Sequence, residues 1–287
     1  MTRQISNWWR ILHSWAWWRR WILKWVVLLI VVGVVLYPKL WLLPRQINRL
    51  RNVNAVLQPD LPALHELEQA ARQAAGPDPT PQVMLAVVQK VVYRHVPYAW
   101  DWEVWGVMDY LPTVEEVLEH GREDCDGRAV VAASLLCRMG YEAWLVSDIG
   151  HMWVRTSAGE TMSPGKGTKT IEGGAEGTQI RWTIDALENL SRALIYGLSV
   201  FPLTRELIIL VAVCGLTMHP RSTAGRRWAG GLLMLLGLGL LHDAGSTALG
   251  QAGLSWRAWL GMLVLLSGWI LLALRVADSH SPATEPQ

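Results

Sequence analysis

The sequence predicts an α+β domain attached to about four transmembrane α-helices, and three observations support this fold class. Apolar residues make up 51% of the 287 residues and charged residues only 17%, whereas about 25% charged residues is usual in soluble proteins. Long apolar runs lie near both ends of the chain. Between them, residues 45–190 show helical periodicity first and short apolar strands afterwards, which is typical of an α+β domain.

Residues 1–21 form a basic, Trp-rich segment that we expect at the cytoplasmic surface of a membrane. Eight of the 18 Trp lie within the first 41 residues, interleaved with Arg10, Arg19 and Arg20. Trp favours the membrane–water interface because its ring is apolar while its N–H needs a partner. A nucleic-acid-binding arm can have the same composition. The apolar run that follows favours membrane lipid as the partner and argues against nucleic acid.

Residues 22–43 are long and apolar enough to cross about 30 Å of hydrocarbon, so we expect the first transmembrane helix there. The C-terminal membrane region 193–276 contains three further expected spans. They cover residues 193–218, which Pro202 interrupts, residues 228–241 and residues 259–276. Arg205 and Glu206, just after Pro202, are expected to form an ion pair at the interface. The polar tail 278–287 is expected to be disordered.

Glycines and basic residues add detail to this membrane region. The glycines of the run 228–241 suit close helix packing in lipid; they are Gly230, Gly231, Gly237 and Gly239. Cytoplasmic loops carry an excess of Lys and Arg, and the loop before this run contains Arg221, Arg226 and Arg227. The loop 242–256 has no Lys or Arg. We therefore expect both chain ends inside and residues 45–190 on the non-cytoplasmic side.

Within 45–190 the pattern predicts four helices and then a small antiparallel sheet. The helices are expected at 61–75, 81–96, 112–120 and 125–138, with Thr113 and Glu116 as a capping box for the third. Strands are expected at 141–147, 151–156 and 179–184. The Gly-rich stretch 157–177 is interpreted as a lid over a site or as a disordered loop.

Cys125 and His151 are the candidate reactive pair. Cys125 begins a predicted helix directly after Asp124, and the positive end of a helix dipole favours a thiolate. That helix rises about 21 Å, and the strand 141–147 returns about 20 Å. His151 then lies back at the level of Cys125, where an imidazole can serve as a base for the thiol. The alternative is a buried Cys and an unrelated surface His.

The segment around this pair resembles the core of the transglutaminase-like superfamily, and within it the bacterial transglutaminase-like cysteine proteinases. The matching features are Tyr98-x-x-Asp101, Pro-Thr-x-Glu-Glu, Gly-x-x-Asp-Cys-Asp, a helix of small residues and Gly-His-x-Trp-Val. They cover about 60 residues, from Tyr98 to Val154. The resemblance implies a papain-like fold in which Cys125 is the nucleophile and His151 the base, with an oxyanion site near the helix N-terminus.

The third catalytic member departs from the pattern of this family, which usually has an Asp on the strand after the His. If Ser157 to Gly159 form the turn and Thr156 pairs with Glu160, then Trp153 faces Ser163 and His151 faces Gly165. Ser163 then takes the place of the acid. A hydroxyl can orient the imidazole but does not stabilise imidazolium as a carboxylate does. Asp148 and Asp185 are alternative partners.

Asp124 and Asp126 flank the thiol and allow two interpretations. Some proteinases of the resembled family bind calcium with acidic residues at this point, which suggests a Ca²⁺ site that includes both side chains. Alternatively Asp124 caps the helix and Asp126 complements its dipole. Two carboxylates are too few for a full Ca²⁺ shell, which favours capping, and we expect no required cofactor.

The expected function is that of a membrane-anchored thiol enzyme that hydrolyses a peptide or amide bond through a Cys125 acyl-enzyme. Its partners would be membrane lipid, a protein or peptide substrate and other envelope proteins, at the periplasmic face of a bacterial inner membrane. The alternatives are a protein-crosslinking acyltransferase and a non-catalytic assembly module of a cell-envelope complex. Aromatic residues before the Cys125 helix are expected either to line a substrate cleft or to pack in the core; they are Trp100, Trp102, Trp105 and Tyr110.

Overall fold

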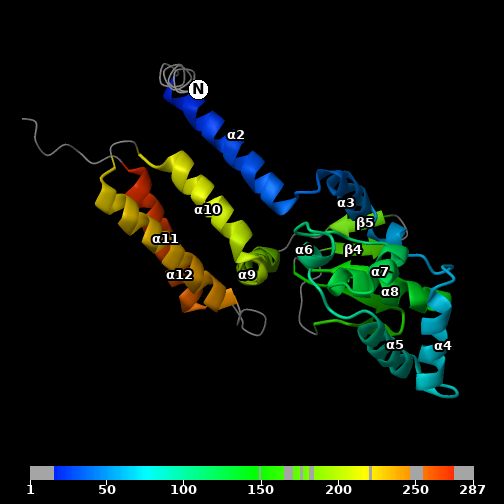
Figure 1. The fold of residues 1–287 in the computed structure, drawn as a ribbon. Helices are drawn as coiled ribbons and strands as arrows, with labels where there is room; N and C mark the ends of the chain where they lie inside the picture. The colour runs from blue at the N-terminus through cyan, green and yellow to red at the C-terminus, as the bar shows by residue number, and fades with distance from the viewer. Residues whose placement is uncertain are drawn as a thin grey trace, which may run out of the picture. The chain divides into compact units, whose positions relative to one another are not determined.

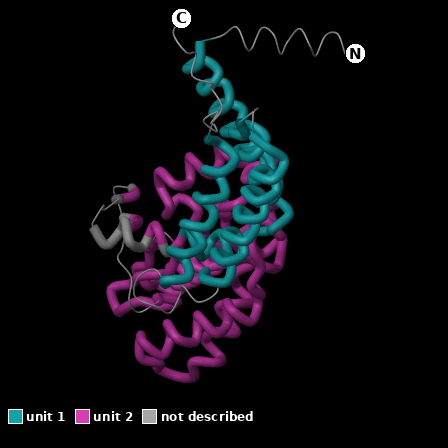
Figure 2. The backbone as a smooth tube through the Cα atoms, turned by 90° about the vertical axis from the view of Figure 1, so that its left-hand side faces the viewer, with its two compact units in different colours: residues 1–35, 194–287 teal, residues 36–193 magenta. Residues whose placement is uncertain are grey.

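The computed structural model describes residues 16–148, 150–164, 171–174, 177–180, 184–219, 222–245 and 255–274. The chain divides into two compact units, which Figure 2 distinguishes by colour. One unit contains Met1–Val35 and Leu194–Gln287, and the other contains Leu36–Ala193. The predicted tail 278–287 and most of the predicted segment 1–21 lie outside the described residues.

The unit Leu36–Ala193 is α+β, as the sequence predicts, with its helices before its sheet (Figure 1). Its α-helices are α3 (Leu43–Arg51), α4 (Leu64–Ala75), α5 (Pro81–His95), α6 (Asp101–Val104), α7 (Val114–His120) and α8 (Cys125–Arg138), and two short 3₁₀ helices are η1 (Leu40–Leu42) and η2 (Val53–Val56). The expected capping box is present. The Thr113 side chain accepts a hydrogen bond from the N–H of Glu116, and the Glu116 side chain accepts one from the N–H of Thr113.

Five antiparallel strands form one sheet in the order β3-β2-β1-β4-β5. They are β1 (Ala143–Ser147), β2 (Met152–Thr156), β3 (Gly159–Thr161), β4 (Ile171–Gly174) and β5 (Gly177–Ile180). Two predictions are corrected here. The Gly-rich stretch 157–177 contains β3 and β4, and the strand expected at 179–184 is β5, after which a helix begins at Ile184. Side chains hold β4 in place, because Ile171 packs against the core and Glu172 pairs with Arg155 at 2.6 Å.

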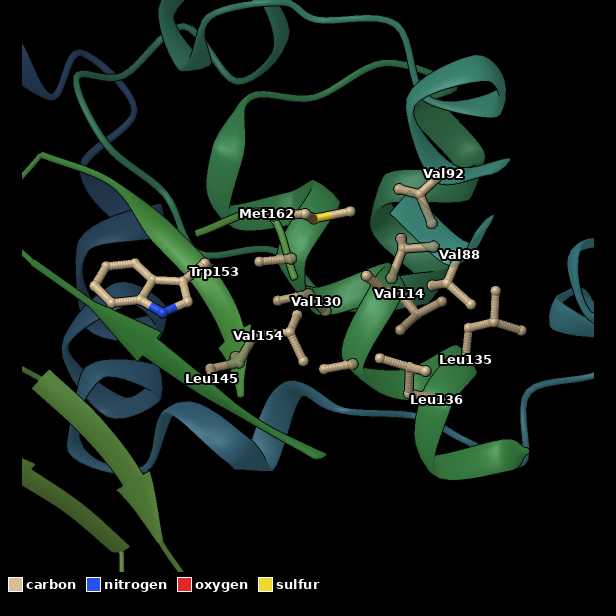
Figure 3. Packing of buried hydrophobic residues seen from close by; sticks show 14 of the residues in the cluster. Val88, Val92, Val114, Val130, Leu135, Leu136, Leu145, Trp153, Val154 and Met162 are labelled. Carbon is tan, nitrogen blue, oxygen red and sulfur yellow. The ribbon is translucent and has the colours of Figure 1, made fainter. Parts of the chain in front are cut away.

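The core lies between the sheet and the helices, with α8 at its centre. Figure 3 shows Val130 of α8 between the strand residues Leu145 and Val154 on one side and the α5 residues Val88 and Val92 on the other. Leu135 and Leu136 of the same helix belong to this cluster. All seven side chains are fully buried, and burial of such an aliphatic side chain stabilises the fold by about 1.5–3 kcal/mol. Small residues at 129, 132 and 133 let α8 approach the strands closely. The core therefore fixes both ends of α8 relative to β1 and β2.

The second unit consists of long apolar helices. They are α2 (Trp17–Leu36), α10 (Leu203–Thr217), α11 (Ala224–Gly245) and α12 (Trp256–Ala273), together with the later part of α9 (Ile184–Val200). By length and composition α11 and α12 can each cross a membrane, and two bent helix pairs bring the number of candidate spans to four. The expected interruption at Pro202 is confirmed, since the helices on either side of it are bent by 109°.

The helix in the region of the first predicted span begins and ends earlier than predicted, and it is a candidate span only together with the bent segment Leu40–Arg51. It covers Trp17–Leu36 in place of 22–43, and the residues from Leu40 onward form η1 and α3. Pro38 explains the end, because a proline disfavours helical geometry at the residue before it. The expected ion pair between Arg205 and Glu206 is also corrected, since the Glu206 carboxylate contacts His242 Nε2 at 2.5 Å.

Close packing of α11 against α12 depends on two of the four predicted glycines. A Cβ on Gly237 would lie 2.6 Å from the backbone nitrogen of Leu265, and one on Gly230 would lie 2.8 Å from the carbonyl oxygen of Gly268. Nothing lies within 4 Å of a Cβ at Gly231 or Gly239. The prediction of glycine-mediated packing is thus confirmed for one face of the helix.

Candidate functional site

Cys125 is the first residue of α8, where the preceding residue caps the helix. The Asp124 side chain accepts a hydrogen bond from the N–H of Asp126 at 3.1 Å, which confirms the predicted capping role. The Asp126 carboxylate accepts from the N–H of Gly127 at 2.6 Å. These two bonds fix the first turn of the helix and hence the direction of the Cys125 side chain.

The thiol of Cys125 lies against the start of strand β2. The backbone N–H of Met152 lies near the sulfur and lowers the pKa of the thiol, against the larger effects of burial and of Asp124. The sulfur is therefore close to the peptide group that joins His151 to Met152. This is the level of the sheet at which the helix and strand lengths place His151. No hydrogen bond joins the thiol to the imidazole among the described residues. Catalytic hydrogen bonds are often long before substrate binds.

The backbone of His151 is held by the turn that precedes it. The Asp148 carboxylate accepts from the N–H groups of Gly150 and His151, at 2.8 and 2.7 Å. Ser147 Oγ donates to the carbonyl of His151 at 3.1 Å. Asp148 therefore shapes the turn and does not contact the imidazole, which removes it as the third catalytic partner. The side chain of Asp185 lies outside the described part of the structure.

The imidazole of His151 has a backbone partner. Its Nε2 lies 2.9 Å from the carbonyl oxygen of Met162. A carbonyl oxygen only accepts hydrogen bonds, so Nε2 carries the hydrogen and Nδ1 of the neutral ring keeps its lone pair. This contact fixes the tautomer that a base needs, with Nδ1 ready to accept a proton.

The predicted position of Ser163 opposite Trp153 is wrong by one residue. Thr156 pairs with Gly159, and Val154 with Thr161, whereas the prediction paired Thr156 with Glu160. A slip of one residue reverses the faces of a strand, so Ser163 does not lie across from Trp153 in this register. The carbonyl of Met162 takes the orienting position in its place.

Met162 is held in a conformation that non-glycine residues seldom adopt. Its φ is +61°, which lies in the left-handed region and costs roughly 1 kcal/mol. Buried contacts hold it there. Its side chain is 5% exposed within the core, and its N–H donates to Gln89 Oε1 at 3.3 Å. The neighbouring Thr161 donates to the carbonyl of Leu85 at 3.1 Å, so helix α5 supports the carbonyl that orients His151.

Four carboxylates gather beside Cys125. Asp101, Glu123, Asp124 and Asp126 each offer an oxygen, and these oxygens lie within 4.8 Å of one another. We call them the acidic cluster. Asp101 is 2% exposed and Glu123 is fully buried. The sequence predicts a site that includes Asp124 and Asp126, and Glu123 lies beside them in the chain, whereas Asp101 reaches the site only through the fold. A parallel bridge between Tyr98 and Glu123 brings the strand before α6 to the start of α8.

The carboxylates of Asp101 and Glu123 are held by backbone and indole N–H groups. Asp101 Oδ2 accepts from the N–H of Tyr110 at 2.6 Å. Glu123 accepts from Trp105 Nε1 and, at 2.7 Å, from the N–H of Asp124. Asp101 Oδ1 is buried and has no hydrogen-bond donor among the described residues. An oxygen in this state is a natural ligand for a cation.

Burial and mutual repulsion raise the pKa values of this group. Burial, followed by the charge of Asp124, raises the pKa of Glu123 to about 7 and the pKa values of Asp101 and Asp126 well above their usual range. The same two causes raise the pKa of the Cys125 thiol, against the opposing hydrogen bond from Met152. Burial and the charge of Asp124 therefore oppose the effect of the helix dipole, and they disfavour the thiolate that the sequence predicts.

The donor set fits a hard divalent cation. Ca²⁺ takes six to eight oxygen ligands and accepts several carboxylates, and the acidic cluster supplies four, one of them with an unsatisfied buried oxygen. The objection that two carboxylates are too few does not apply to four. Capping by Asp124 and cation binding are compatible, since one oxygen of its carboxylate caps the helix.

The aromatic residues before α8 divide between the two expected roles. Trp105 and Tyr110 are buried and pack with Leu42 and Val107 in a small second core. Trp100 stacks on Trp102 with ring centroids 4.8 Å apart, and both are partly exposed. The exposed Tyr98 ring meets Trp100 edge-on and the Arg128 guanidinium at 5.0 Å. The second group lies at the surface near the nucleophile.

Comparisons of this chain with protein-family models, with curated proteins and with solved structures give no match. The chemistry of the site is therefore inferred from the residues that form it.

Proposed function

We propose that this chain is a membrane-anchored thiol enzyme of the transglutaminase-like type that hydrolyses a peptide or amide bond. Cys125 is the nucleophile and His151 the base. One observation carries the proposal: the Cys125 sulfur lies near the peptide group that follows His151, while Nε2 of the His151 ring contacts the Met162 carbonyl, which leaves Nδ1 as the nitrogen that can accept a proton when the ring is neutral. A nucleophile, a base and a group that orients the base are the components of this chemistry.

The proposed reaction proceeds in two stages. The thiol proton passes to Nδ1 of His151 as the Cys125 sulfur attacks the carbonyl carbon of the substrate. The carbon–nitrogen bond then breaks, the imidazolium gives its proton to the leaving amine, and a thioester remains on Cys125. Imidazole next removes a proton from water, which attacks the thioester, and the released carboxylic acid leaves a free thiol.

The oxyanion formed in each stage would be stabilised at the start of α8. Helix N-termini leave their first N–H groups without intrahelical partners. The N–H groups of Asp126 and Gly127 are already used by Asp124 and Asp126. This leaves the backbone N–H of Cys125 itself as the nearest donor, and one oxyanion donor contributes about 2.7–4 kcal/mol to such reactions.

The acidic cluster supports a regulatory role for Ca²⁺. Burial raises the pKa of the Cys125 thiol most, and the charge of Asp124 raises it further. Bound through Asp101, Glu123, Asp124 and Asp126, Ca²⁺ would neutralise this second effect. The chain's own residues then provide the chemistry, and the ion sets the fraction of reactive thiolate.

We also propose that the domain faces the non-cytoplasmic side of a bacterial inner membrane. The support is the placement of Lys and Arg, which leaves the loop 242–256 without a basic residue. Membrane lipid and a protein or peptide substrate in the envelope are then its partners. Reporter fusions after Leu43 and after His219 test this orientation. A cytoplasmic reporter at the first position would reverse it.

Thiol labelling of the full chain tests the proposed function. Cys137 and Cys214 are replaced by Ala, so that iodoacetamide reports on Cys125 alone. We expect Ca²⁺ to speed labelling at pH 6, and we expect His151→Ala to lower the rate in the presence of Ca²⁺ at least tenfold. A labelling rate that His151→Ala does not change would contradict the proposal that the chain is an enzyme.

A non-catalytic envelope assembly module is the second candidate, and one observation favours it. Burial and the carboxylates raise the pKa of Cys125, and no carboxylate contacts the His151 ring among the described residues.

If the acyl-enzyme forms but an amine resolves it, the protein is a crosslinking acyltransferase. Product analysis with a lysine-like amine as competing acceptor distinguishes that reaction from hydrolysis.

A further inference from the structure

The residues that follow the first membrane helix are bound to a loop of the catalytic domain. We call residues 36–51 the juxtamembrane segment and residues 104–111 the bracket loop. The carbonyl of Leu36, the last residue of α2, accepts from the N–H of Met108 at 2.8 Å. Tyr37 donates its hydroxyl to the carbonyl of Asp109 at 2.6 Å. The chain leaving α2 is therefore attached to the bracket loop from its first residues.

Gln46 makes the most buried of these attachments. It is 3% exposed, and both ends of its amide are used. Its Nε2 donates to Asp109 Oδ2 at 2.6 Å, and its Oε1 accepts from the N–H of Leu111 at 2.7 Å. A buried amide with both ends paired fixes position as well as stability, because a shift of the loop leaves polar groups unpaired.

Arg49, one helical turn later, binds the end of the same loop. Its guanidinium donates to the carbonyl of Leu111 at 2.8 Å and to the Glu116 carboxylate at 2.7 Å. It also lies over the Tyr110 ring, 5.0 Å from its centroid. The juxtamembrane segment thus contacts the bracket loop at Met108, Asp109, Tyr110 and Leu111.

The opposite side of the bracket loop holds the two buried carboxylates of the acidic cluster. The N–H of Tyr110 donates to Asp101 Oδ2 at 2.6 Å, and Trp105 Nε1 donates to Glu123. Two further N–H groups, of Trp105 and Gly106, donate to the carbonyl of Asp101. A displacement of the loop therefore moves Asp101 and Glu123, which are the two most deeply buried ligands of the cluster.

We propose that Gln46 is a positioning residue for the acidic cluster, through which the juxtamembrane segment sets the cation affinity of the Cys125 site. This inference rests on the proposed function, because it assigns Gln46 a role at the site proposed to be catalytic. A single path of hydrogen bonds then links the end of the first membrane helix to the residues beside the nucleophile. A displacement of that helix end would change the occupancy of the cation site.

The experiment measures Tb³⁺ binding to the full chain in detergent. Tb³⁺ replaces Ca²⁺ at carboxylate sites, and the indole of Trp105, bonded to Glu123, can sensitise its luminescence. We expect Gln46→Ala to weaken Tb³⁺ binding about tenfold, because two buried hydrogen bonds are lost. Val88→Ala is the matched control, since it truncates a fully buried core residue away from the loop. Its Tb³⁺ affinity should stay within about twofold of wild type.

A rescue pair separates positioning from loss of fold. Gln46→Glu keeps the acceptor for the N–H of Leu111 but faces the Asp109 carboxylate with a second carboxylate. It should weaken Tb³⁺ binding as strongly as Gln46→Ala. Adding Asp109→Asn returns a donor to the pair and should restore the affinity to within about threefold of the Asp109→Asn single variant. That single variant is the reference because it also removes a negative charge that acts on Asp101. A general loss of stability would not be repaired by this second change.

Two results overturn the inference: a wild-type chain that does not bind Tb³⁺, or a Gln46→Ala chain that binds it as Val88→Ala does. The proposed function fails on a different observation, which is iodoacetamide labelling of Cys125 that does not depend on His151. The two failures are therefore distinguishable, since Tb³⁺ affinity is measured without any reaction of the thiol.

Discussion

Replacement of Gly127 by Ala should displace Glu123 from the acidic cluster. A Cβ on Gly127 would lie 2.1 Å from Glu123 Cγ and 3.0 Å from Val117 Cγ2, so the carboxylate side chain must move by more than about 1 Å to reach ordinary contact. Glu123 is fully buried and bonded to Trp105 and to the N–H of Asp124. Movement on this scale breaks both bonds.

The expected cost follows from these contacts. Two hydrogen bonds to a charged or buried group are worth roughly 2–4 kcal/mol together, and overpacking adds about 1 kcal/mol or more. The gain in helix propensity from Gly to Ala returns at most about 1 kcal/mol. We therefore expect Gly127→Ala to lower the free energy of unfolding by roughly 2–4 kcal/mol, and Tm by about 5–10 °C for a unit of this size.

A double-mutant cycle isolates the contact with Glu123. Glu123→Ala removes Cγ, the atom closest to the new methyl group, and leaves Cβ at 2.9 Å, so Gly127→Ala should cost at least about 1 kcal/mol less in that background than in the wild type. Thermal unfolding of the four full-length proteins in detergent, followed by near-UV circular dichroism, supplies the four free energies. Additive effects of the two changes, with no coupling above about 0.5 kcal/mol, would refute the steric account of Gly127.

Three further outcomes are expected. In the unit of long apolar helices, Gly237→Ala should lower the free energy of unfolding in SDS by about 1–3 kcal/mol. Gly239→Ala should be neutral, because only the first change would place a Cβ against Leu265. Equal effects of the two changes would contradict the packing of α11 against α12. Burial raises the pKa of Glu123 to about 7 from 4.5, so the folded state holds a proton that the unfolded chain releases. In EDTA, thermal stability should therefore fall as pH rises from about 4.5 to 7, and Glu123→Gln should flatten this dependence; a rise with pH would reverse the assignment. Ser163→Ala should leave the rate of Cys125 alkylation within about twofold, because a backbone carbonyl orients the imidazole; a tenfold loss would return Ser163 to the site.

Local signals in the sequence were enough to locate helix α8, which begins at Cys125. Its observed ends, Cys125 and Arg138, are those predicted, because Asp124 supplies a cap and Gly140 adopts a positive φ just beyond. Pro202 likewise marks the break between two membrane helices. In each case the determining residue lies within a few positions of the structural feature.

Local signals did not determine the register of the β2–β3 hairpin. The turn contains only Ser157 and Ala158, neither of which is typical of a two-residue hairpin turn. The φ of +141° at Gly159 shows why glycine is needed there, although glycine alone fits either register. Because of this error of one residue, the prediction placed the Ser163 side chain beside the His151 ring, whereas the structure places the Met162 carbonyl there.

The acidic cluster could not be assembled from local patterns either. Asp101 and Glu123 are separated along the chain, and they meet because Tyr98 bridges to Glu123 while the bracket loop donates hydrogen bonds to both carboxylates. Long-range contacts of this kind also reverse the electrostatic expectation for Cys125, because a helix N-terminus alone would favour the thiolate.

The proximity of Cys125 to the ring of His151 is the central claim, and bifunctional alkylation tests it most directly. 1,3-Dibromoacetone carries two reactive carbons on either side of one carbonyl, so it bridges a thiol and an imidazole only when they are neighbours. With Cys137 and Cys214 replaced by Ala, mass spectrometry of the digested protein should find the peptide of Cys125 joined to the peptide of His151. Alkylation of Cys125 with no bridge to His151 would contradict the proposed pair.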